Sequence, residues 1–290
     1  MQELTHVLVT GRTGQLSQEI YSLIDNYPNY TFTFTDRSQL DFSQPETIPV
    51  FFADKQYDII INCVAYTAVD KAESEADLAD LINHQAVKQL ALIAHDHQCK
   101  LIHISTDYVF DGTNHIPYIE TDEPNPQGVY GKTKLKGEQA IQQIMSENAL
   151  IIRTSWVYSR FGSNFVKTMM RLGEEREQLN VIFDQLGTPT YANDLAKAIL
   201  YITQSDDFHR SHFSTDLYHY SNEGVASWYD FAKAIFELSN IDCNVNPIET
   251  KDYPTAASRP CYSLMNKSKI KNDFDLTIPY WKDALKDYLK

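Results

Sequence analysis

A short apolar segment followed by a glycine-containing turn constrains the fold of this chain more than any other feature. Residues 6–10 read as a buried strand, Gly11 and Gly14 lie in the turn, and a helical stretch continues to Ile24. In such units the first glycine allows the tight turn, and the second lets the backbone approach a pyrophosphate at the start of the helix. Because Ser17 stands where a third glycine is usual, the turn alone fits a plain strand–turn–helix as well as a dinucleotide site.

Strand-like and helical segments alternate through the first half of the chain. Residues 76–96 carry apolar side chains at helical spacing, which indicates a helix that faces a core. This rhythm predicts an α/β fold built on a Rossmann-type doubly wound parallel sheet. The further strand segments on which the prediction depends are 31–35, 57–65, 100–104 and 150–153.

The regular alternation loosens in the second half of the chain. A helical pattern is still present in residues 191–203, and a short strand is expected at residues 217–220. We therefore predict an NAD(P)-binding Rossmann domain at residues 1–158 and a smaller C-terminal substrate-binding lobe formed mainly by residues 159–290. Some later segments are expected to return to the first domain.

Composition and charge argue against several classes of protein. Hydrophobic residues make up 43% of the 290, which predicts a globular chain, and the formal net charge of -14 argues against a nucleic-acid partner, which would need a basic face. The sequence has no apolar run long enough to cross a membrane, its first six residues lack the basic start of a signal peptide, and its four cysteines show no C-x-x-C spacing. We expect a cytoplasmic protein with no metal and no membrane association.

Polar residues follow the second strand segment, at the place where a bound nucleotide would lie. An acid such as Asp36 would hydrogen-bond an adenosine ribose, whereas Arg37 could hold a 2′-phosphate. Both are present, so NADH is an alternative, but Arg37 favours NADPH. Asp41 and Phe42 form an acidic–aromatic pair that could flank the adenine.

A tyrosine and a lysine lie four residues apart, one turn apart on a predicted helix. A lysine ammonium beside a phenol favours the phenolate, so Lys134 is expected to make Tyr130 easier to ionise and able to exchange a proton with a carbonyl oxygen. Thr106, just after the fourth strand segment, carries a hydroxyl that could hydrogen-bond the same carbonyl. An ordinary amphipathic helix and an ordinary turn would account for the same residues.

Taken together, these segments resemble the extended short-chain dehydrogenase/reductases and, within them, the family of dTDP-4-dehydrorhamnose reductases. The glycine turn and the Tyr–Lys pair are common to the whole superfamily, whereas the Ala-Tyr-Thr and Thr-Asp-Tyr stretches are specific to this branch. The resemblance extends over nearly the whole chain, and its marks include residues 9–16, 65–73, 105–112, 130–134, 153–158, 184–190, 228–232 and 259–260.

The resemblance implies reduction of the 4-keto group of dTDP-4-dehydro-β-L-rhamnose to dTDP-β-L-rhamnose by NADPH, the last step of dTDP-rhamnose biosynthesis. It implies a catalytic triad in which Tyr130 gives a proton, Lys134 lowers the pKa of Tyr130 and holds the nicotinamide ribose, and Thr106 polarises the carbonyl. The other implied contacts are Gly14, Gln15 and Leu16 with the pyrophosphate, Ala65, Tyr66 and Thr67 along the cofactor, Thr106 and Asp107 at the sugar, and Trp156 against the substrate.

Other members of the superfamily offer competing functions. Related 4,6-dehydratases carry a glutamate base after Thr-Asp, but this chain has Tyr108 there. An epimerase would use the same triad with a tightly held NAD, and only the branch-specific stretches argue against it. A relative of this branch serves as a non-catalytic, NADP-binding regulatory subunit of methionine adenosyltransferase, although the intact triad favours an enzyme.

Some relatives bind magnesium through carboxylates at a dimer contact. Glu19 matches one of these positions, but Asn193 stands where a second glutamate would be. We therefore do not predict a magnesium-linked dimer, and a homodimer formed in another way remains a possible assembly.

Overall fold

A parallel β-sheet runs through the larger part of the computed structural model, which describes residues 4–209 and 212–290. Within these residues the sheet has six strands in the order β10-β5-β4-β3-β1-β2, and every pairing is parallel. The order changes direction at β1, and the edge formed by the carboxyl ends of the strands is the usual ligand side of such sheets. The predicted α/β fold with a doubly wound sheet is confirmed. The strands are β1 (Thr5–Thr10), β2 (Tyr30–Thr35), β3 (Ile59–Asn62), β4 (Lys100–Thr106), β5 (Ala149–Thr154) and β10 (Asp216–His219).

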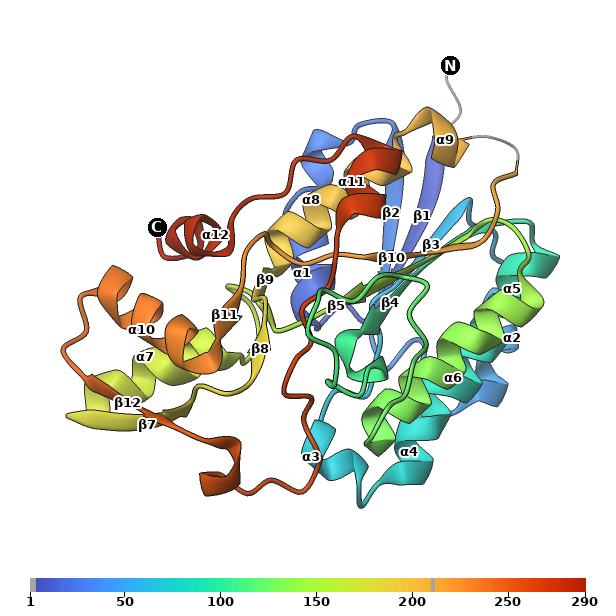
Figure 1. Ribbon diagram of the computed structural model, residues 1–290. Coiled ribbons are helices and arrows are strands. Elements are labelled where there is room, and N and C mark those ends of the chain that lie inside the picture. The colour runs from blue at the N-terminus through green and yellow to red at the C-terminus, as the bar shows by residue number, and fades with distance from the viewer. Residues whose placement is uncertain (1–3, 210–211) are drawn as a thin grey trace.

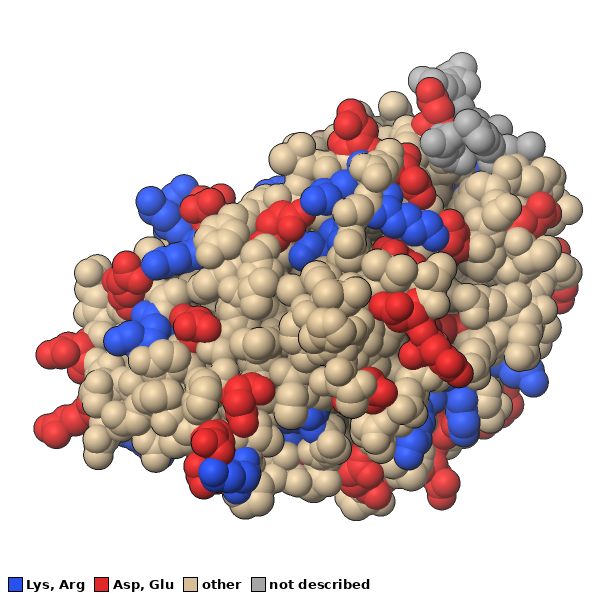
Figure 2. Space-filling model, viewed as in Figure 1, with Lys and Arg blue, Asp and Glu red and all other residues tan. Residues whose placement is uncertain are grey.

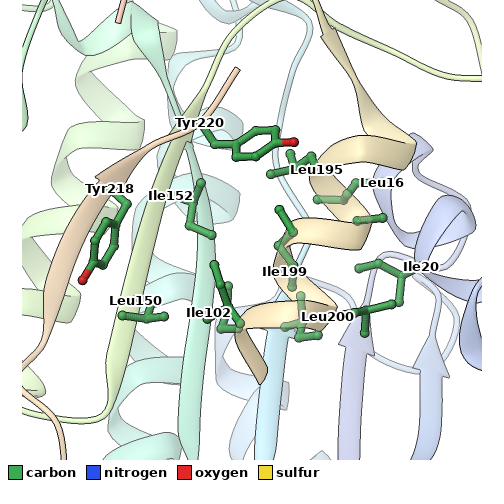
Figure 3. Packing of buried hydrophobic residues seen from close by; sticks show 14 of the residues in the cluster. Leu16, Ile20, Ile102, Leu150, Ile152, Leu195, Ile199, Leu200, Tyr218 and Tyr220 are labelled. Carbon is green, nitrogen blue, oxygen red and sulfur yellow. The ribbon is translucent and has the colours of Figure 1, made fainter. Parts of the chain in front are cut away.

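Helices cover both faces of the sheet, and strand alternation decides which side chains they meet (Figure 1). Val7 and Val9 point into one apolar cluster, whereas Leu8 between them points into the other. Figure 3 shows Leu195 and Ile199 in the first cluster, facing Ile102 and Ile152 of the sheet. The first face is covered by α1 (Gln15–Tyr21), α8 (Ala192–Thr203), α9 (Asp206–His209) and α11 (Ser268–Phe274), and the second by α2 (Ile48–Phe52), α5 (Ala86–Asp96) and α6 (Val129–Ile144).

The predicted helix at residues 76–96 is interrupted by a wider turn. It consists of α4 (Ala76–Asp80), a π-helical turn (Leu81–Gln85) and α5, and such turns often lie at functional sites. The buried Asn83 in this turn accepts a hydrogen bond from the Tyr66 backbone N–H at 2.8 Å and donates to Thr133 Oγ1 of α6 at 3.1 Å. It thereby ties the loop after β3, which contains α3 (Val69–Ala72), to the helix that carries Tyr130 and Lys134.

A second, smaller lobe lies beside the sheet, at the left of Figure 1. Its core gathers around the fully buried Phe231, which packs on Phe165 and Tyr158. Helix α10 begins with a capping box between Ser227 and Asp230, which satisfies the first backbone N–H groups of the helix. The lobe contains β6 (Val157–Tyr158), α7 (Phe165–Glu175), β7 (Gln178–Ile182), β8 (Leu186–Gly187), β9 (Thr190–Tyr191), β11 (Ala226–Ser227), α10 (Trp228–Ser239), β12 (Asn244–Ile248) and α12 (Trp281–Tyr288).

Helices α8, α9 and α11 and strand β10 come from the second half of the chain but belong to the sheet and its covering helices. Helices α8 and α11 pack on the first face of the sheet, and β10 pairs with β5 as an edge strand. The division of the chain at residues 158 and 159 into two functional domains stays a prediction.

Surface charge and helix length are relevant to two predictions, that the protein binds no nucleic acid and no membrane. On the face shown in Figure 2, acidic and basic side chains are scattered among neutral ones. Among the described residues, every helix is too short or too polar to span a membrane. Residues 1–3, which belong to the first six residues that were expected to lack a signal peptide, lie outside the described residues.

Candidate active site

Three predicted catalytic side chains meet at the carboxyl edge of the sheet. Thr106 is the last residue of β4, and Tyr130 and Lys134 lie one turn apart on α6. The Thr106 hydroxyl lies close enough to the Tyr130 phenol to lower the pKa of the phenol. The Tyr108 ring packs edge-on against the Tyr130 ring, with centroids 5.4 Å apart. The Tyr130 phenol therefore has a hydroxyl close to it and an aromatic ring packed against it.

Tyr130 is harder to ionise in this structure than the sequence suggested. Burial raises the pKa of Tyr130 to about 12; the nearby Thr106 hydroxyl lowers it less, and the Asp107 carboxylate adds to the rise. The predicted lowering of the Tyr130 pKa by Lys134 is wrong, because Lys134 is not among the groups that shift this pKa. The physical reason is that the Lys134 ammonium is directed elsewhere, with Nζ at 2.6 Å from the Ile104 carbonyl oxygen and 3.2 Å from His103 Nε2.

Lys134 itself is almost completely buried. Burial lowers its pKa to about 8, and the opposite charge of Glu138 offsets part of that effect. Glu138 lies one turn further along α6 and forms an ion pair with Arg153 of β5, whose Nη2 is 2.6 Å from Glu138 Oε2. Ser105 also donates to Glu138. Beneath the proposed catalytic residues there is thus a buried charged network, which the sequence analysis did not identify.

Asp107 offers a polar group with spare hydrogen-bonding capacity. Its Oδ1 accepts from Thr106 Oγ1 at 3.1 Å, while its buried Oδ2 has no hydrogen-bond partner among the described residues. Burial raises the pKa of Asp107 to about 6, although the nearby hydroxyl groups of Ser263 and Thr106 oppose the rise. An orphaned carboxylate oxygen next to Tyr130 is suited to receive a hydroxyl group of a ligand.

The predicted glycine turn has the backbone that a close ligand requires. Gly11 has a φ of +77°, and a Cβ added there would lie 3.0 Å from Val64 Cγ2. Gln15 and Leu16 are the first two residues of helix α1, and no side chain caps the first backbone N–H groups of this helix. Ser17 fits the position of the third glycine because its hydroxyl donates to the Gly11 carbonyl and, at 3.2 Å, to that of Gly14.

The residues after β2 form a compact polar turn. Asp36 accepts hydrogen bonds from the backbone and the hydroxyl of Ser38 at 2.9 and 2.6 Å. The largely exposed side chain of Arg37 is held by Asp41, with Nε 3.1 Å from Oδ2. Phe42 is buried in the core of the second face, and its predicted contact with adenine stays a prediction.

The loop after β3 brings Ala65, Tyr66 and Thr67 to the same edge. Ala65 and Tyr66 are partly buried, whereas Thr67 is exposed. The Tyr66 hydroxyl donates to Glu75 Oε2 at 2.6 Å, and this hydrogen bond is the main cause that raises the pKa of Tyr66 to about 12. This loop borders the glycine turn, because a Cβ added at Gly11 would lie 3.0 Å from the Val64 side chain.

A cavity of about 670 Å³ lies between the smaller lobe and the segment around residues 252–259. Trp228 lines this cavity and stacks on the predicted substrate residue Trp156, with ring centroids 3.7 Å apart. Two arginines, Arg176 and Arg259, also line it. The sequence analysis gave no role to Trp228 or to either arginine, although an Arg-Pro pair at residue 259 was among the marks of the family.

Gly131, between the two predicted catalytic residues of α6, allows a close backbone contact. A Cβ at this position would lie 2.2 Å from the Tyr108 carbonyl oxygen. Gly131→Ala should therefore shift α6 and lower turnover by up to about 10²-fold, even though alanine favours a helix. The comparison is with Lys132→Ala on the exposed face of the same turn, in steady-state assays of both variants. Equal turnover of the two variants would show that the contact at Gly131 does not position Tyr130.

Glu19 is engaged within the chain. Its buried carboxylate accepts from Ser159 Oγ at 2.6 Å and from Asn193 Nδ2 at 2.9 Å. Asn193, which stands where some relatives have a second glutamate, is thus a donor to Glu19. In the part of the chain that the structure describes, no three His, Cys, Asp or Glu side chains are grouped so that they could hold a metal ion.

Comparison with known proteins agrees with this arrangement. A family model described as the RmlD substrate binding domain matches residues 5–290. The dTDP-4-dehydrorhamnose reductase of Escherichia coli strain K12 is 40% identical over 297 residues, which cover 98% of this chain and 97% of the relative.

Solved structures of the same kind superpose over nearly the full length. A dTDP-4-dehydrorhamnose reductase from Clostridium acetobutylicum has a TM-score of 0.91 and 40% identity, with 98% of each chain covered. The reductase from Bacillus anthracis, solved in complex with NADP, has a TM-score of 0.91 and 37% identity over 98% of each chain. The resemblance predicted from the motifs is confirmed, and this chain belongs to the dTDP-4-dehydrorhamnose reductase family.

Proposed function

We propose that this chain uses NADPH to reduce the 4-keto group of dTDP-4-dehydro-β-L-rhamnose, which gives dTDP-β-L-rhamnose. The observation that carries the proposal is the meeting of Thr106, Tyr130 and Lys134 at the sheet edge where the glycine turn also lies. Membership of the reductase family and the NADP complex of the Bacillus anthracis relative support the same reaction.

Each of the three side chains has a distinct task in this proposal. Reduction of a ketone requires a hydride on carbon and a proton on the developing alkoxide, and bound NADPH supplies the hydride. Tyr130 donates the proton; with a pKa raised to about 12 it is fully protonated at neutral pH. Thr106 hydrogen-bonds the carbonyl oxygen and orients Tyr130, while Lys134 holds the nicotinamide ribose.

The residues around the glycine turn fit a dinucleotide. Gly11 and Gly14 leave the turn without side chains, and the first N–H groups of α1 have no side-chain cap. Gln15 and Leu16 follow at the start of that helix, where a pyrophosphate would lie. Asp36 and Arg37 follow the neighbouring strand β2 and are placed for a ribose and its 2′-phosphate.

The smaller lobe is proposed to hold the nucleotide-sugar substrate. The cavity is lined by Arg176 and Arg259, which suit a diphosphate, and by Trp228, which stacks on Trp156. Arg259 also forms a two-point ion pair with Asp70, at 2.7 Å for the shorter contact. This pair joins the cavity wall to the loop after β3. Arg259 also lies near Tyr108, whose ring packs against the ring of Tyr130.

The environment of Tyr108 favours reduction over dehydration, and the state of the cysteines fits a cytoplasmic enzyme. Burial and the nearby Asp107 carboxylate raise the pKa of Tyr108, so this residue cannot replace the glutamate base of related dehydratases. All four cysteines, Cys63, Cys99, Cys243 and Cys261, are free thiols, as is usual in a reducing compartment.

The direct test is NADPH oxidation by the purified protein with dTDP-4-dehydro-L-rhamnose made in situ by the upstream enzymes. We expect oxidation that depends on the sugar. If the protein binds NADPH but no sugar-dependent oxidation occurs, the proposed reaction is excluded and a regulatory role becomes the better account.

Arg37→Ala tests the proposed choice of cofactor. Loss of a charge-assisted hydrogen bond at an exposed site should raise the Kd for NADPH about tenfold and leave that for NADH nearly unchanged. Lys55→Ala, a change at another partly exposed cation, provides the control in the same fluorescence titrations. Equal losses of affinity for both cofactors would exclude recognition of the 2′-phosphate by Arg37.

A further inference from the structure

An exposed aspartate of α3 holds an arginine of the cavity and the backbone next to it. Asp70 Oδ2 accepts from Arg259 Nη2 at 2.7 Å, and Asp70 Oδ1 accepts from Arg259 Nη1 at 3.1 Å. The same Oδ1 accepts from the Ala257 backbone N–H at 3.1 Å. Hydrogen bonding from Arg259 lowers the pKa of Asp70, so this carboxylate stays charged at neutral pH. Asp70 therefore fixes both the guanidinium and the segment that carries it.

These contacts use only part of the Arg259 guanidinium. An arginine side chain has five N–H groups in a planar fork. Two of them donate to Asp70, and a third, on Nη1, donates to the Ala257 carbonyl oxygen at 3.2 Å. This leaves the Nε–H and the second N–H of Nη2, which lie side by side on the adjacent edge. Such a pair of parallel donors matches two oxygens of a phosphate group.

The remaining edge belongs to a residue of the cavity that is proposed to hold the nucleotide sugar. Arg259 lines this cavity, and only 21% of its side chain is exposed. An arginine that is free to turn loses side-chain freedom when it binds a ligand, and this loss weakens binding. Because Asp70 holds the guanidinium before a ligand arrives, most of that loss is avoided.

Helix α3 is itself attached to the helix that carries Tyr130. Glu73, the residue after α3, accepts from the backbone N–H of Val129, the first residue of α6, at 2.8 Å. The short helix thus contacts α6 through Glu73 and the cavity wall through Asp70. These contacts set the position of Arg259 relative to Tyr130, as a substrate anchored at one end and reduced at the other requires.

We propose that Asp70 is a positioning residue, which holds one edge of the Arg259 guanidinium so that the other edge binds the diphosphate of a nucleotide sugar. The inference rests on the substrate proposed above, and it gives a task to a carboxylate that does not itself touch the ligand. Charge alone has the opposite effect, because a carboxylate near a diphosphate repels it. Removal of the charge of Asp70 therefore separates positioning from simple electrostatics.

Binding of dTDP and dTMP in the presence of excess NADP⁺ tests the proposal without turnover. The NADP⁺ keeps both nucleotides out of the cofactor site, and dTMP lacks the second phosphate of dTDP. In calorimetric titrations we expect the wild-type protein to bind dTDP about tenfold more tightly than dTMP. Asp70→Asn should lose most of this preference, because its Kd for dTDP rises while its Kd for dTMP stays nearly unchanged.

Three further variants complete the test. Arg259→Lys keeps the positive charge but removes the fork, so it should weaken dTDP binding to a similar extent. In Asp70→Asn/Arg259→Lys the change at Asp70 should cause no further weakening, because no fork is left to orient. The control is Glu237→Gln, which removes the acidic partner of an exposed ion pair with Lys282 and should keep the preference for dTDP.

Unchanged or tighter binding of dTDP by Asp70→Asn would overturn the inference. Equal losses for dTDP and dTMP would also overturn it, since they would show a general disturbance of the cavity. Neither result affects the reductase activity, which the NADPH assay measures separately. A wild-type protein that binds NADP⁺ but neither nucleotide would reject the proposed substrate and, with it, the inference. Circular dichroism checks the fold, and Asp70→Ser replaces Asp70→Asn if that variant does not fold.

Discussion

Tyr130→Phe is expected to bind NADPH normally and to lose about 10²–10⁴-fold in turnover. The phenylalanine keeps the edge-on contact with the Tyr108 ring but lacks the hydroxyl that donates the proton. Because the hydroxyl is proposed to act on the alkoxide, kcat should fall much more than the affinity for the cofactor. Single-turnover assays together with fluorescence titration of NADPH measure the two effects separately.

The control for this variant is Tyr201→Phe, which removes a hydroxyl from an exposed tyrosine of α8. Near-normal turnover of Tyr130→Phe would remove Tyr130 from the mechanism. A loss of turnover matched by an equal loss of NADPH affinity would instead give Tyr130 a role in cofactor binding alone.

Arg153→Met is expected to lower the free energy of unfolding by about 3–5 kcal/mol. The variant leaves the Glu138 carboxylate buried, with a side-chain exposure of 1%, and without its ion-pair partner. It also removes the guanidinium that lies 5.1 Å from the centre of the Phe110 ring. Urea unfolding followed by circular dichroism gives the change.

The matched control is the double variant Glu138→Leu/Arg153→Met. It replaces both charges by apolar groups, so it should recover most of the stability that the single variant loses. If the double variant is as unstable as Arg153→Met or less stable, the loss would come from packing and not from an unpaired buried charge.

Much of the six-stranded sheet and its covering helices could be predicted because most of the strands carry uninterrupted apolar runs. The alternation of strands and helices gave the five strands of the first half, and the strand expected at residues 217–220 is present as β10. Its position beside β5 could not be predicted, since this pairing joins residues that are 66 positions apart in the sequence. The π-helical turn at Leu81–Gln85 was also missed, because the pattern of apolar residues is the same in a regular helix.

The candidate site was predicted less completely than the fold. Tyr130, Lys134 and Thr106 were identified from local motifs, and the structure brings them together. The direction of the Tyr130 pKa shift was wrong because burial and the side-chain direction of Lys134 are tertiary properties. The buried ion pair of Glu138 and Arg153 was missed, because the sequence does not show which charged residues lie in the interior.

The central claim is that this chain transfers a hydride to the 4-carbon of a nucleotide-linked keto sugar. The most direct test uses NADPH that carries deuterium at the transferable position of the nicotinamide, with dTDP-4-dehydro-L-rhamnose as the acceptor. We predict dTDP-L-rhamnose with one deuterium at C4, seen as the loss of the H4 signal in its proton spectrum. A rhamnose product without deuterium at C4, or no product despite bound NADPH, would contradict the account.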